Sequence, residues 1–503
     1  METTDFSQPI RQSSKGIIVI FAFNVFTFFK KFFVLFIAFG VSLMRRKSFG
    51  NMSPTMMMLG LIGVLIIILI IAILKYLNFK FHLSKDDFHL ATGIINKDTT
   101  IIPKSKIQNV YIKQNFLQQV INVVSVKIET AGDKKSEIEI SALDKPTALR
   151  LKKKLFTKAN LENENKITDG AEVPTERNVF FKVTPKRLLL EGLSQNHFKS
   201  FLGITAFVFG LYYEFKDYLE DLNLKDTVEG VVDLKEQTLL NLLIANVLII
   251  LAVVLFSFIF SVVKTFIINF NLEVVEHQKT IEINKGLFNK VSLSLTPNRI
   301  QNLVITTNRV KQYFGLHSLS VKQAMVDVKQ QKNFKIVALE KAQLNYLLNK
   351  LLADYNDGAP EKAKPRPYFM RISALEMLLF GIIINSLALF LFGTQLLWIN
   401  AVFIPLAALY VYFAYKKAYY KISDNFVTIG SGVIDTTTNI LEIHKIQAVK
   451  LQQTIFQKRQ HIASVKISTA SKSVTIPYIS KSEALSIYNF LLYKVESQDK
   501  DWM

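Results

Sequence analysis

Four apolar segments are long enough to cross a lipid bilayer, and this feature restricts the fold more than any other. About 20 apolar residues in a helix, at about 1.5 Å of rise per residue, span the hydrocarbon core of about 30 Å. The four segments are Thr55–Leu74, Leu239–Val263, Ile372–Phe392 and Leu396–Tyr415. Together they carry one acidic residue, Glu376. The sequence therefore predicts an integral membrane protein.

Two weaker segments complete three helix pairs. Phe198–Tyr213 is short for a span and needs local thinning of the bilayer or help from flanking residues. Phe26–Met44 contains Lys30 and Lys31, whose long side chains can reach back to the interface. The stretch Gly16–Phe29 is expected to lie flat as an amphipathic helix. We therefore predict six transmembrane helices in three hairpins.

The distribution of charge predicts the orientation, because Lys and Arg near membrane spans stay on the cytoplasmic side. Bases outnumber acids in residues 81–158, 270–353 and 419–494, whereas acids outnumber bases in the hairpin loop 214–236. Arg45, Arg46 and Lys47 in the first hairpin loop oppose this pattern but are outweighed. Both termini and the three regions between spans are predicted to be cytoplasmic.

Each helix pair is followed by a copy of the same sequence pattern. A glycine and two apolar residues come first, at Gly93, Gly286 and Gly432, and a basic-Ile-Gln triplet places its glutamine 15 residues later. The triplets are Lys106-Ile107-Gln108, Arg299-Ile300-Gln301 and Lys445-Ile446-Gln447. A Ser-Val-Lys strand then starts at Ser125, Ser320 and Ser464, which is 17, 19 and 17 residues after the glutamine. We attribute the longer spacing to a two-residue loop insertion in the second copy.

Apolar and polar residues alternate within each copy, which is typical of β-strands. The copies then end in amphipathic helices predicted at Lys145–Ala159, Leu339–Tyr355 and Ser480–Glu496. Ser480 with Glu483 is a capping-box start for the third helix. Several short strands followed by one helix predict a small barrel or sandwich, so the fold class is α+β.

These residues resemble the bacterial PH-like domain of YdbS/YdbT-type membrane proteins. The resemblance is carried by the glycine turn, the basic-Ile-Gln triplet and the strand that ends at Glu129-Thr130-Ala131-Gly132. The order of three hairpins and three domains resembles the larger, YdbT-like branch. The second and third copies depart from the strand motif, with Lys322-Gln323-Ala324 and Ser468-Thr469-Ala470-Ser471.

The resemblance implies a pleckstrin-homology-like fold, in which seven strands form a bent barrel capped by a carboxy-terminal helix. It also implies location in a bacterial cytoplasmic membrane and a partner with a single hairpin and one such domain. The predicted order is an amino terminus and interfacial helix at 1–25, hairpin 1 at 26–78, domain 1 at 79–159, a linker at 160–197, hairpin 2 at 198–266, domain 2 at 267–355, a linker at 356–371, hairpin 3 at 372–416 and domain 3 at 417–497.

The triplets are the best candidates for contact with an anionic lipid headgroup or an acidic partner segment. Their polar members are Lys106, Gln108, Arg299, Gln301, Lys445 and Gln447. The alternative is structural: the isoleucines face the core, the glutamines bond a neighbouring loop and the bases are solvated. Each helix pair is also preceded by proline and then a base, at Arg11, Arg187 and Arg371, which predicts bases at headgroup level.

No catalytic or metal-binding constellation is recognisable in the sequence. The absence of cysteine excludes disulfides and thiol chemistry. His82 and His89, seven residues apart in one strand-like stretch, are expected on opposite faces. We therefore expect no enzyme activity, no cofactor and no metal.

The expected function is that of a membrane scaffold whose domains bind partner proteins, self-associate or contact anionic lipids. The resemblance implies a role in envelope maintenance or defence. The expected partners are membrane lipids and either a second copy or a smaller single-hairpin relative. The Lys152-Lys153-Lys154 cluster lies on a membrane-tethered helix, so attraction to lipid explains it better than nucleic acid. No small-molecule substrate is indicated. The alternative is a transporter or lipid-handling channel, for which Glu376, Asn24, Asn246 and Asn385 are the polar groups within spans.

Overall fold

The structure is a computed structural model. The structure describes residues 5–33, 54–130, 137–156, 178–221, 239–277, 280–295, 297–324, 332–352, 355, 361–393, 397 and 400–498. Several sequence predictions fall outside these residues: most of the span Phe26–Met44, the bases Arg45, Arg46 and Lys47, the motif residues Ala131 and Gly132, most of the acidic loop 214–236 and most of the linker 160–178.

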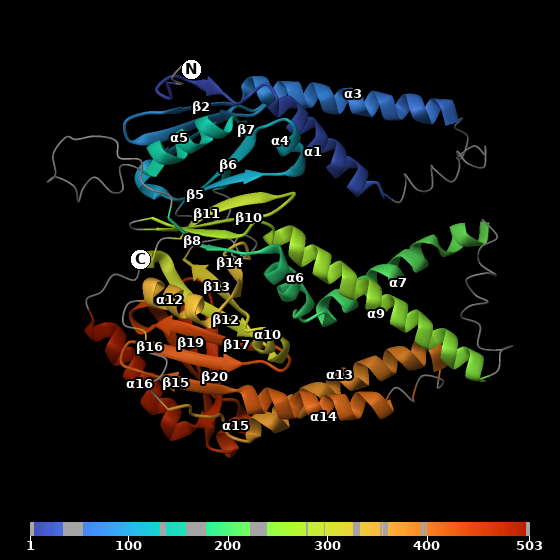
Figure 1. Cartoon of the computed structure of the whole chain (residues 1–503), viewed down its shortest axis with the longest axis vertical. Coiled ribbons are helices and arrows are strands. Elements are labelled where there is room, and N and C mark those ends of the chain that lie inside the picture. The colour runs from blue at the N-terminus through green and yellow to red at the C-terminus, as the bar shows by residue number, and fades with distance from the viewer. Residues whose placement is uncertain are drawn as a thin grey trace. The chain divides into compact units, whose positions relative to one another are not determined.

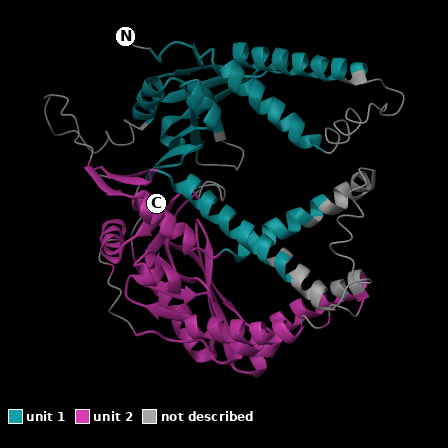
Figure 2. Cartoon of the chain, turned by 45° about the vertical axis from the view of Figure 1, so that its right-hand side comes forward, with its two compact units in different colours: residues 1–176, 197–270, 284–294 teal, residues 177–196, 271–283, 295–503 magenta. Residues whose placement is uncertain are grey.

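The chain folds into two compact units, and their boundary divides the second copy (Figure 2). Unit 1 contains residues 1–176, 197–270 and 284–294, and unit 2 contains residues 177–196, 271–283 and 295–503. Domain 1 therefore lies within unit 1 and domain 3 within unit 2.

Along the chain, a pair of long apolar helices precedes most of the strands of each copy (Figure 1). The helices are α1 (Gly16–Lys31), α3 (Pro54–Asn78), α7 (Phe198–Asp221), α9 (Leu239–Asn269), α13 (Tyr368–Phe392) and α14 (Asn400–Lys417). The two helices of each pair contact each other, α1 with α3, α7 with α9, and α13 with α14. Helix pairs occur at the second and third predicted hairpins. At the first, α1 covers the predicted interfacial helix Gly16–Phe29, and most of the predicted span Phe26–Met44 lies outside the described residues.

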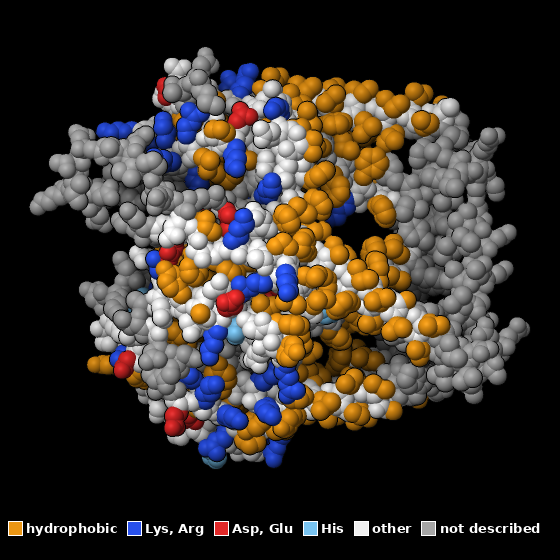
Figure 3. All heavy atoms as spheres, in the orientation of Figure 1, with side chains coloured by type: hydrophobic (Ala, Val, Ile, Leu, Met, Phe, Trp, Pro, Cys, Tyr) orange, Lys and Arg blue, Asp and Glu red, His pale blue; other side chains and the backbone are white. Residues whose placement is uncertain are grey.

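Three helical segments among the described residues are long and apolar enough to cross a membrane. They are Met58–Asn78, Leu251–Asn269 and Tyr368–Ser386, and a shorter apolar segment covers Phe198–Val208. Hydrophobic side chains cover these helices, whereas Lys and Arg gather over the sheets (Figure 3). A helix that exposes apolar side chains all around is matched to lipid and not to water.

The strands of each copy follow one order, and a short strand from before the helix pair is added to the first two. Domain 1 contains β1 (Ile10–Arg11), β2 (Lys80–Leu83), β3 (Asp87–Thr92), β4 (Asp98–Pro103), the 3₁₀ turn η1 (Lys104–Lys106), β5 (Ile107–Gln114), α4 (Phe116–Val120), β6 (Val124–Thr130), β7 (Glu137–Leu143) and α5 (Lys145–Phe156). Its core lies between the sheet β1-β2-β3-β4 and strands β5 to β7, and α5 closes it.

Domain 2 repeats this order. It contains β8 (Asn178–Lys182), α6 (Pro185–Leu193), β9 (Glu273–Glu276), β10 (Ile281–Lys285), β11 (Lys290–Leu295), η2 (Pro297–Arg299), β12 (Ile300–Thr307), α10 (Arg309–Tyr313), β13 (His317–Gln323), β14 (Lys335–Leu339) and α12 (Lys341–Leu351). Strand β8 precedes the helix pair and joins the domain by pairing with β9.

Domain 3 contains β15 (Tyr419–Ile422), β16 (Phe426–Ser431), β17 (Thr436–Glu442), η4 (Ile443–Lys445), β18 (Ile446–Gln452), α15 (Ile455–Arg459), β19 (Ile462–Thr469), β20 (Ser473–Ser480) and α16 (Lys481–Ser497). An isolated bridge between Ala363 and Tyr420 takes the place of the added strand. The three closing helices predicted from the sequence are therefore present, and Ser480 caps α16 by accepting a hydrogen bond from the Glu483 amide.

The repeated glycine has the same backbone role in each copy. Gly93, Gly286 and Gly432 have φ values of +108°, +110° and +123°, a region that side-chain-bearing residues rarely adopt. A Cβ at these positions would lie 1.8 to 2.0 Å from the carbonyl oxygen three residues later. The turn between the second and third strands of each domain therefore requires glycine.

The basic-Ile-Gln triplet is a 3₁₀ turn that leads into a bulged strand. Ile107, Ile300 and Ile446 are buried, as expected if they face the core. The pairing of β5, β12 and β18 with the following strand shifts register at Gln108, Gln301 and Gln447. A bulge inserts one unpaired residue and bends the strand. The triplet thus sets the local geometry of the fold.

The predicted two-residue insertion in the second copy is wrong. Ile128, Val321 and Ile467 each lie 20 residues after the triplet glutamine, and each pairs with the residue two after it. The serine equivalent to Ser125 and Ser464 is Ser318, which sits at the same bulge, and not Ser320. The error arose because a strand has a period of two, so a motif displaced by two residues keeps the same faces.

Adjacent copies are joined through their sheets. In unit 1, β11 of the second copy pairs antiparallel with β5 of the first. In unit 2, β17 of the third copy pairs antiparallel with β12 of the second, within the six-stranded order β14-β13-β12-β17-β16-β15. The fourth strand of one copy therefore extends the first sheet of the next copy.

Candidate functional site

The polar residues of the three triplets lie in different environments. Lys106 and Gln447 are exposed, Arg299 is half-buried, and Gln301 is buried. Lys445 is buried and forms an ion pair with Glu442. The side chain of Gln108 is outside the described part of the structure. The three bases therefore differ in exposure and in partners from one copy to the next, and binding at the triplets stays a prediction.

The three bases predicted at the approach to the membrane also differ. Arg11 is exposed on strand β1, where it pairs with Lys80 of β2. The Arg187 guanidinium donates to the Ala338 carbonyl at 2.8 Å and forms an ion pair with Glu340 at 3.1 Å. It therefore fastens α6 to the end of β14 and the start of α12. Arg371 is exposed at the start of α13 and lines a cavity.

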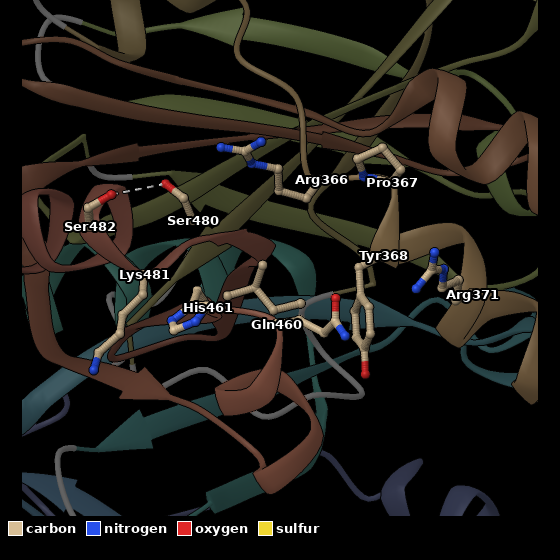
Figure 4. A pocket seen from close by; sticks show the side chains of 10 residues that line it. Arg366, Pro367, Tyr368, Arg371, Gln460, His461, Ser480, Lys481 and Ser482 are labelled. Atoms are coloured by element: carbon tan, nitrogen blue, oxygen red, sulfur yellow. Dashed lines mark hydrogen bonds between the residues drawn. The ribbon is translucent and has the colours of Figure 1, made fainter.

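This cavity has a volume of about 580 Å³ and basic side chains in its lining, so it is a candidate site for an anion. It is lined by Arg366, Pro367, Tyr368, Arg371, Gln460, His461, Ile462, Ser480, Lys481 and Ser482. Tyr368 and Arg371 lie toward one side of it and Lys481 toward the other, with His461 and Gln460 between them in this view (Figure 4). Three permanent cations and several hydroxyl groups thus surround one hollow at the start of an apolar helix.

Local structure brings these side chains together from three segments. The Arg366 amide donates to the Tyr478 carbonyl at 2.8 Å, which holds the linker against β20 just before α13. The Lys481 amide donates to the His461 carbonyl at 2.9 Å, which joins the start of α16 to the residue after α15. His461 has a φ of +51°, in the left-handed region that ends the short helix. The amino-terminal end of α16 adds the positive end of a helix dipole.

The lining of the cavity is cationic, and the nearby carboxylates of Glu483 and Glu376 lie outside it. Glu483, in the first turn of α16, accepts a hydrogen bond from the Tyr420 hydroxyl. Burial raises the pKa of the Tyr478 phenol, and the carboxylate of Glu376 adds to the rise, so Tyr478 is neutral near pH 7. None of the residues that line the cavity is acidic. An anionic group such as a phosphate would therefore meet complementary charge there.

The sequence indicated only part of this site. Arg371 was predicted as a base at headgroup level, and Arg366 lies in the basic linker beside it. His461 follows a short helix and Lys481 begins a long one, and no local sequence pattern marks the two residues as neighbours. The antiparallel pairing of β19 with β20, which sets Ile462 opposite Ser480, brings these positions together, and the hydrogen bond between His461 and Lys481 continues it.

A second polar cluster is buried inside domain 2. The Lys311 ammonium of α10 lies 2.5 Å from the Glu191 carboxylate of α6 and donates to the Ser318 hydroxyl at 2.8 Å. Ser318 in turn donates to Glu191 at 3.0 Å. Gln118 and Gln457 occupy the equivalent position in the other copies and cap their short helices. The cluster is therefore a structural replacement specific to the second copy.

The histidine prediction requires correction. His82 and His89 lie on β2 and β3, directly opposite each other, and their rings stack at 4.4 Å. The sequence reading failed because it placed both residues on one strand, whereas a turn separates them. No group of three or more potential metal ligands occurs among the described residues.

Comparison with known families agrees with the repeat. The bacterial PH domain family matches residues 26–159, 224–355 and 379–495. The chain belongs to the bacterial PH domain family. Its three matched segments correspond to the three copies, and each match begins within or between the helices of a pair and reaches the closing helix.

A relative is similar to this chain over most of its length. The UPF0699 transmembrane protein YdbT of Bacillus subtilis (strain 168) is 24% identical over 468 residues, which cover 88% of this chain and 92% of the relative. The bacterial PH domain protein described here is thus a three-unit, YdbT-like membrane protein. The resemblance noted from the sequence motifs is confirmed.

Proposed function

We propose that this protein is a non-enzymatic scaffold of the bacterial cytoplasmic membrane. Six helices, in three hairpins, anchor it, and its PH domains face the cytoplasm. The domains contact anionic lipid headgroups and assemble with other protein chains. Three matches to a PH domain family support the binding role, and a transmembrane relative supports the membrane anchor.

The observation that carries the lipid-binding part is the cationic cavity of domain 3. Arg366, Arg371 and Lys481 surround it, and the apolar helix α13 starts at Tyr368 in its wall. A lipid with an anionic headgroup has the complementary form, since its phosphate can occupy the cavity while its acyl chains follow the apolar helix. Each base near a membrane surface contributes about 1 kcal/mol to attraction for anionic lipid.

The test is the binding of short-chain phosphatidylglycerol to the detergent-solubilised full chain. The triple variant Arg366→Gln, Arg371→Gln, Lys481→Gln removes about 3 kcal/mol of attraction, so affinity should fall by up to roughly a hundredfold. The matched control, Lys332→Gln, Lys341→Gln, Lys472→Gln, removes the same charge from exposed positions away from the cavity. Equal losses in the two variants, or equal binding of phosphatidylcholine by the natural chain, would contradict the proposal.

The contacts of Asn385 support a structural role for this residue and not the transport alternative. Asn385 of α13 and Asn400 of α14 exchange two amide hydrogen bonds, at 2.9 and 2.7 Å. Asn385 therefore fastens two neighbouring helices to each other, which is the usual role of an asparagine in a membrane helix. The side chain of Asn246 is outside the described part of the structure.

A further inference from the structure

The two junctions between successive copies have the same register. In unit 2, Leu303 of β12 pairs with Ile440 of β17. In unit 1, Gln114 of β5 pairs with Lys290 of β11. Leu303 lies 2 residues after the triplet glutamine of its copy, and Ile440 lies 8 residues after the turn glycine of the next copy. The same two distances are 6 for Gln114 and 4 for Lys290. They sum to ten at both junctions, so the register is the same. The junction is therefore a repeated structural element.

Each junction also has a second contact, between the short helix of one copy and the glycine turn of the next. Phe116 of α4 packs edge-on against Phe288 at 5.7 Å, and Gln119 donates to the Leu287 and Phe288 carbonyls. At the other junction, Asn308 at the start of α10 donates to the Asp435 carboxylate at 3.0 Å. The short helix and the strand before it thus form one face of the junction.

The first and last copies each present one half of this junction without the other. Strand β4 ends the sheet β1-β2-β3-β4, and β18 ends the sheet β18-β19-β20. Among the described residues, no strand pairs with the outer side of either one. Such edges readily pair with a further strand.

Apolar residues at the two open ends are more exposed than their equivalents at the internal junctions. Ile101 on β4 is 56% exposed, whereas its equivalent Ile440 is fully buried at the internal junction. Ile95 in the first glycine turn is 99% exposed, against 45% for the equivalent residue at the filled first junction, and Ile455 at the start of α15 is 77% exposed, against 61%. Ile95 is equivalent to Phe288 and Ile455 to Phe116, the two residues that touch at the first junction. The two open ends are apolar where the internal junctions make contact.

We propose that β18 of one chain pairs antiparallel with β4 of a second copy of this chain, in the register of the internal junctions. That register places Val449 opposite Ile101, Lys450 opposite Thr100 and Leu451 opposite Thr99, with Ile455 against Ile95. The interface is head-to-tail, so it generates a ring or a row of chains. The occupant is a second copy because both halves of a junction already built twice in this chain are present at its ends.

This inference deepens the assembly part of the scaffold proposed above. It makes a membrane array in which the same kind of junction joins successive copies within a chain and between chains. It is independent of the lipid cavity, because the cavity is lined by none of the residues of β4 or β18. Failure of the lipid test and failure of the assembly test can therefore be told apart.

The absence of cysteine from the natural sequence permits a direct test by cross-linking. Two differently tagged full-length chains, one with Ile101→Cys and the other with Val449→Cys, are co-expressed, and isolated membranes are mildly oxidised. Side chains directly opposite each other in a sheet have Cβ atoms about 4.5–5.5 Å apart, close to the spacing of a disulfide. A cross-linked dimer that carries both tags is expected.

Two matched comparisons test the register and the turn contact. Lys450→Cys replaces Val449→Cys and projects from the opposite face, so its dimer yield should fall by roughly fivefold or more. Ile95→Lys, added to the Ile101→Cys chain, should lower the yield similarly, while Leu149→Lys at a half-exposed position of α5 should not. Because Ile95 is exposed in the single chain, the change leaves the fold intact.

Three results would overturn the proposal. The Lys450→Cys pair could link as well as the Val449→Cys pair, or cross-links could join Ile101→Cys to a different protein. Alternatively, in a chain with both Ile101→Cys and Val449→Cys, the disulfide could form only between the two cysteines of the same chain. Each result excludes a second copy in the stated register.

Discussion

The buried ion pair of domain 2 allows a stability prediction with a defined size. Glu191 is fully buried, and the side chain of Lys311 is 3% exposed. One carboxylate oxygen of Glu191 accepts from Lys311 and Ser318, and the other has no hydrogen-bond partner among the described residues. Lys311 is therefore the main compensation for a charge that is shielded from water.

Replacing Lys311 with Met removes this compensation without leaving a large cavity. Breaking a buried pair by removing one partner costs about 3–5 kcal/mol, because the remaining charge is uncompensated. For a unit of this size, about 1 kcal/mol corresponds to roughly 2–4 °C in Tm, so Lys311→Met should lower the Tm by roughly 6–20 °C. The double variant Lys311→Met, Glu191→Leu replaces the whole pair with apolar groups and should recover most of the loss.

The assay is thermal unfolding of the full chain in detergent, followed by a probe in unit 2. Lys341→Met, at an exposed position of α12, is the matched control and should leave the Tm unchanged. A Tm for Lys311→Met within about 2 °C of the natural chain would refute the reasoning. So would a double variant that is no more stable than the single one, because the cost then does not come from the unpaired carboxylate.

Two further predictions concern domain 2. Burial lowers the pKa of His317 below its ordinary value of 6.5, and the nearby cations Lys341 and Lys311 add to this, so the protonated form favours the unfolded state. The stability from neutral His317 is complete above pH 6.5 and is lost as the pH falls below it; the drop in Tm between pH 7.5 and pH 5 should therefore be smaller in His317→Gln, and an equal drop would contradict this. Gly286→Ala should cost roughly 3 kcal/mol or more, because φ is +110° and the new Cβ would lie 2.0 Å from the Asn289 oxygen. The matched change Gly315→Ala, at φ +66° with open space around it, should cost about 1 kcal/mol, and similar losses in both would show that the turn contact does not matter.

Much of the fold follows from the sequence because the signals are local and repeated. The apolar segments, the glycine turns and the closing helices each depend on a few adjacent residues, and the structure contains all three. The triplet also has a local cause, since its isoleucine enters the core and its glutamine occupies a bulge. Repetition of such residues indicates a repeated fold and gives no information about a ligand.

The rest could not be predicted because it depends on which strands are neighbours. Period-two patterns allowed Ser320 to be aligned with Ser125, although Ser318 is the equivalent residue at the bulge. Pairing between the sheets of successive copies has no sequence signal of its own, since β12 and β17 are more than a hundred residues apart. The cationic cavity likewise joins Arg371 to Lys481 through contacts that appear only in the folded chain.

The scaffold account depends most directly on the side of the membrane that the PH domains face. Single cysteines introduced at the exposed positions Lys106, Asn298 and Gln447 report on domains 1, 2 and 3, because the natural chain contains no cysteine. In intact cells, a membrane-impermeant maleimide should label none of the three, and permeabilisation should allow it to label them all. Labelling of any of these cysteines in intact cells would place that domain outside the cytoplasm and contradict the account.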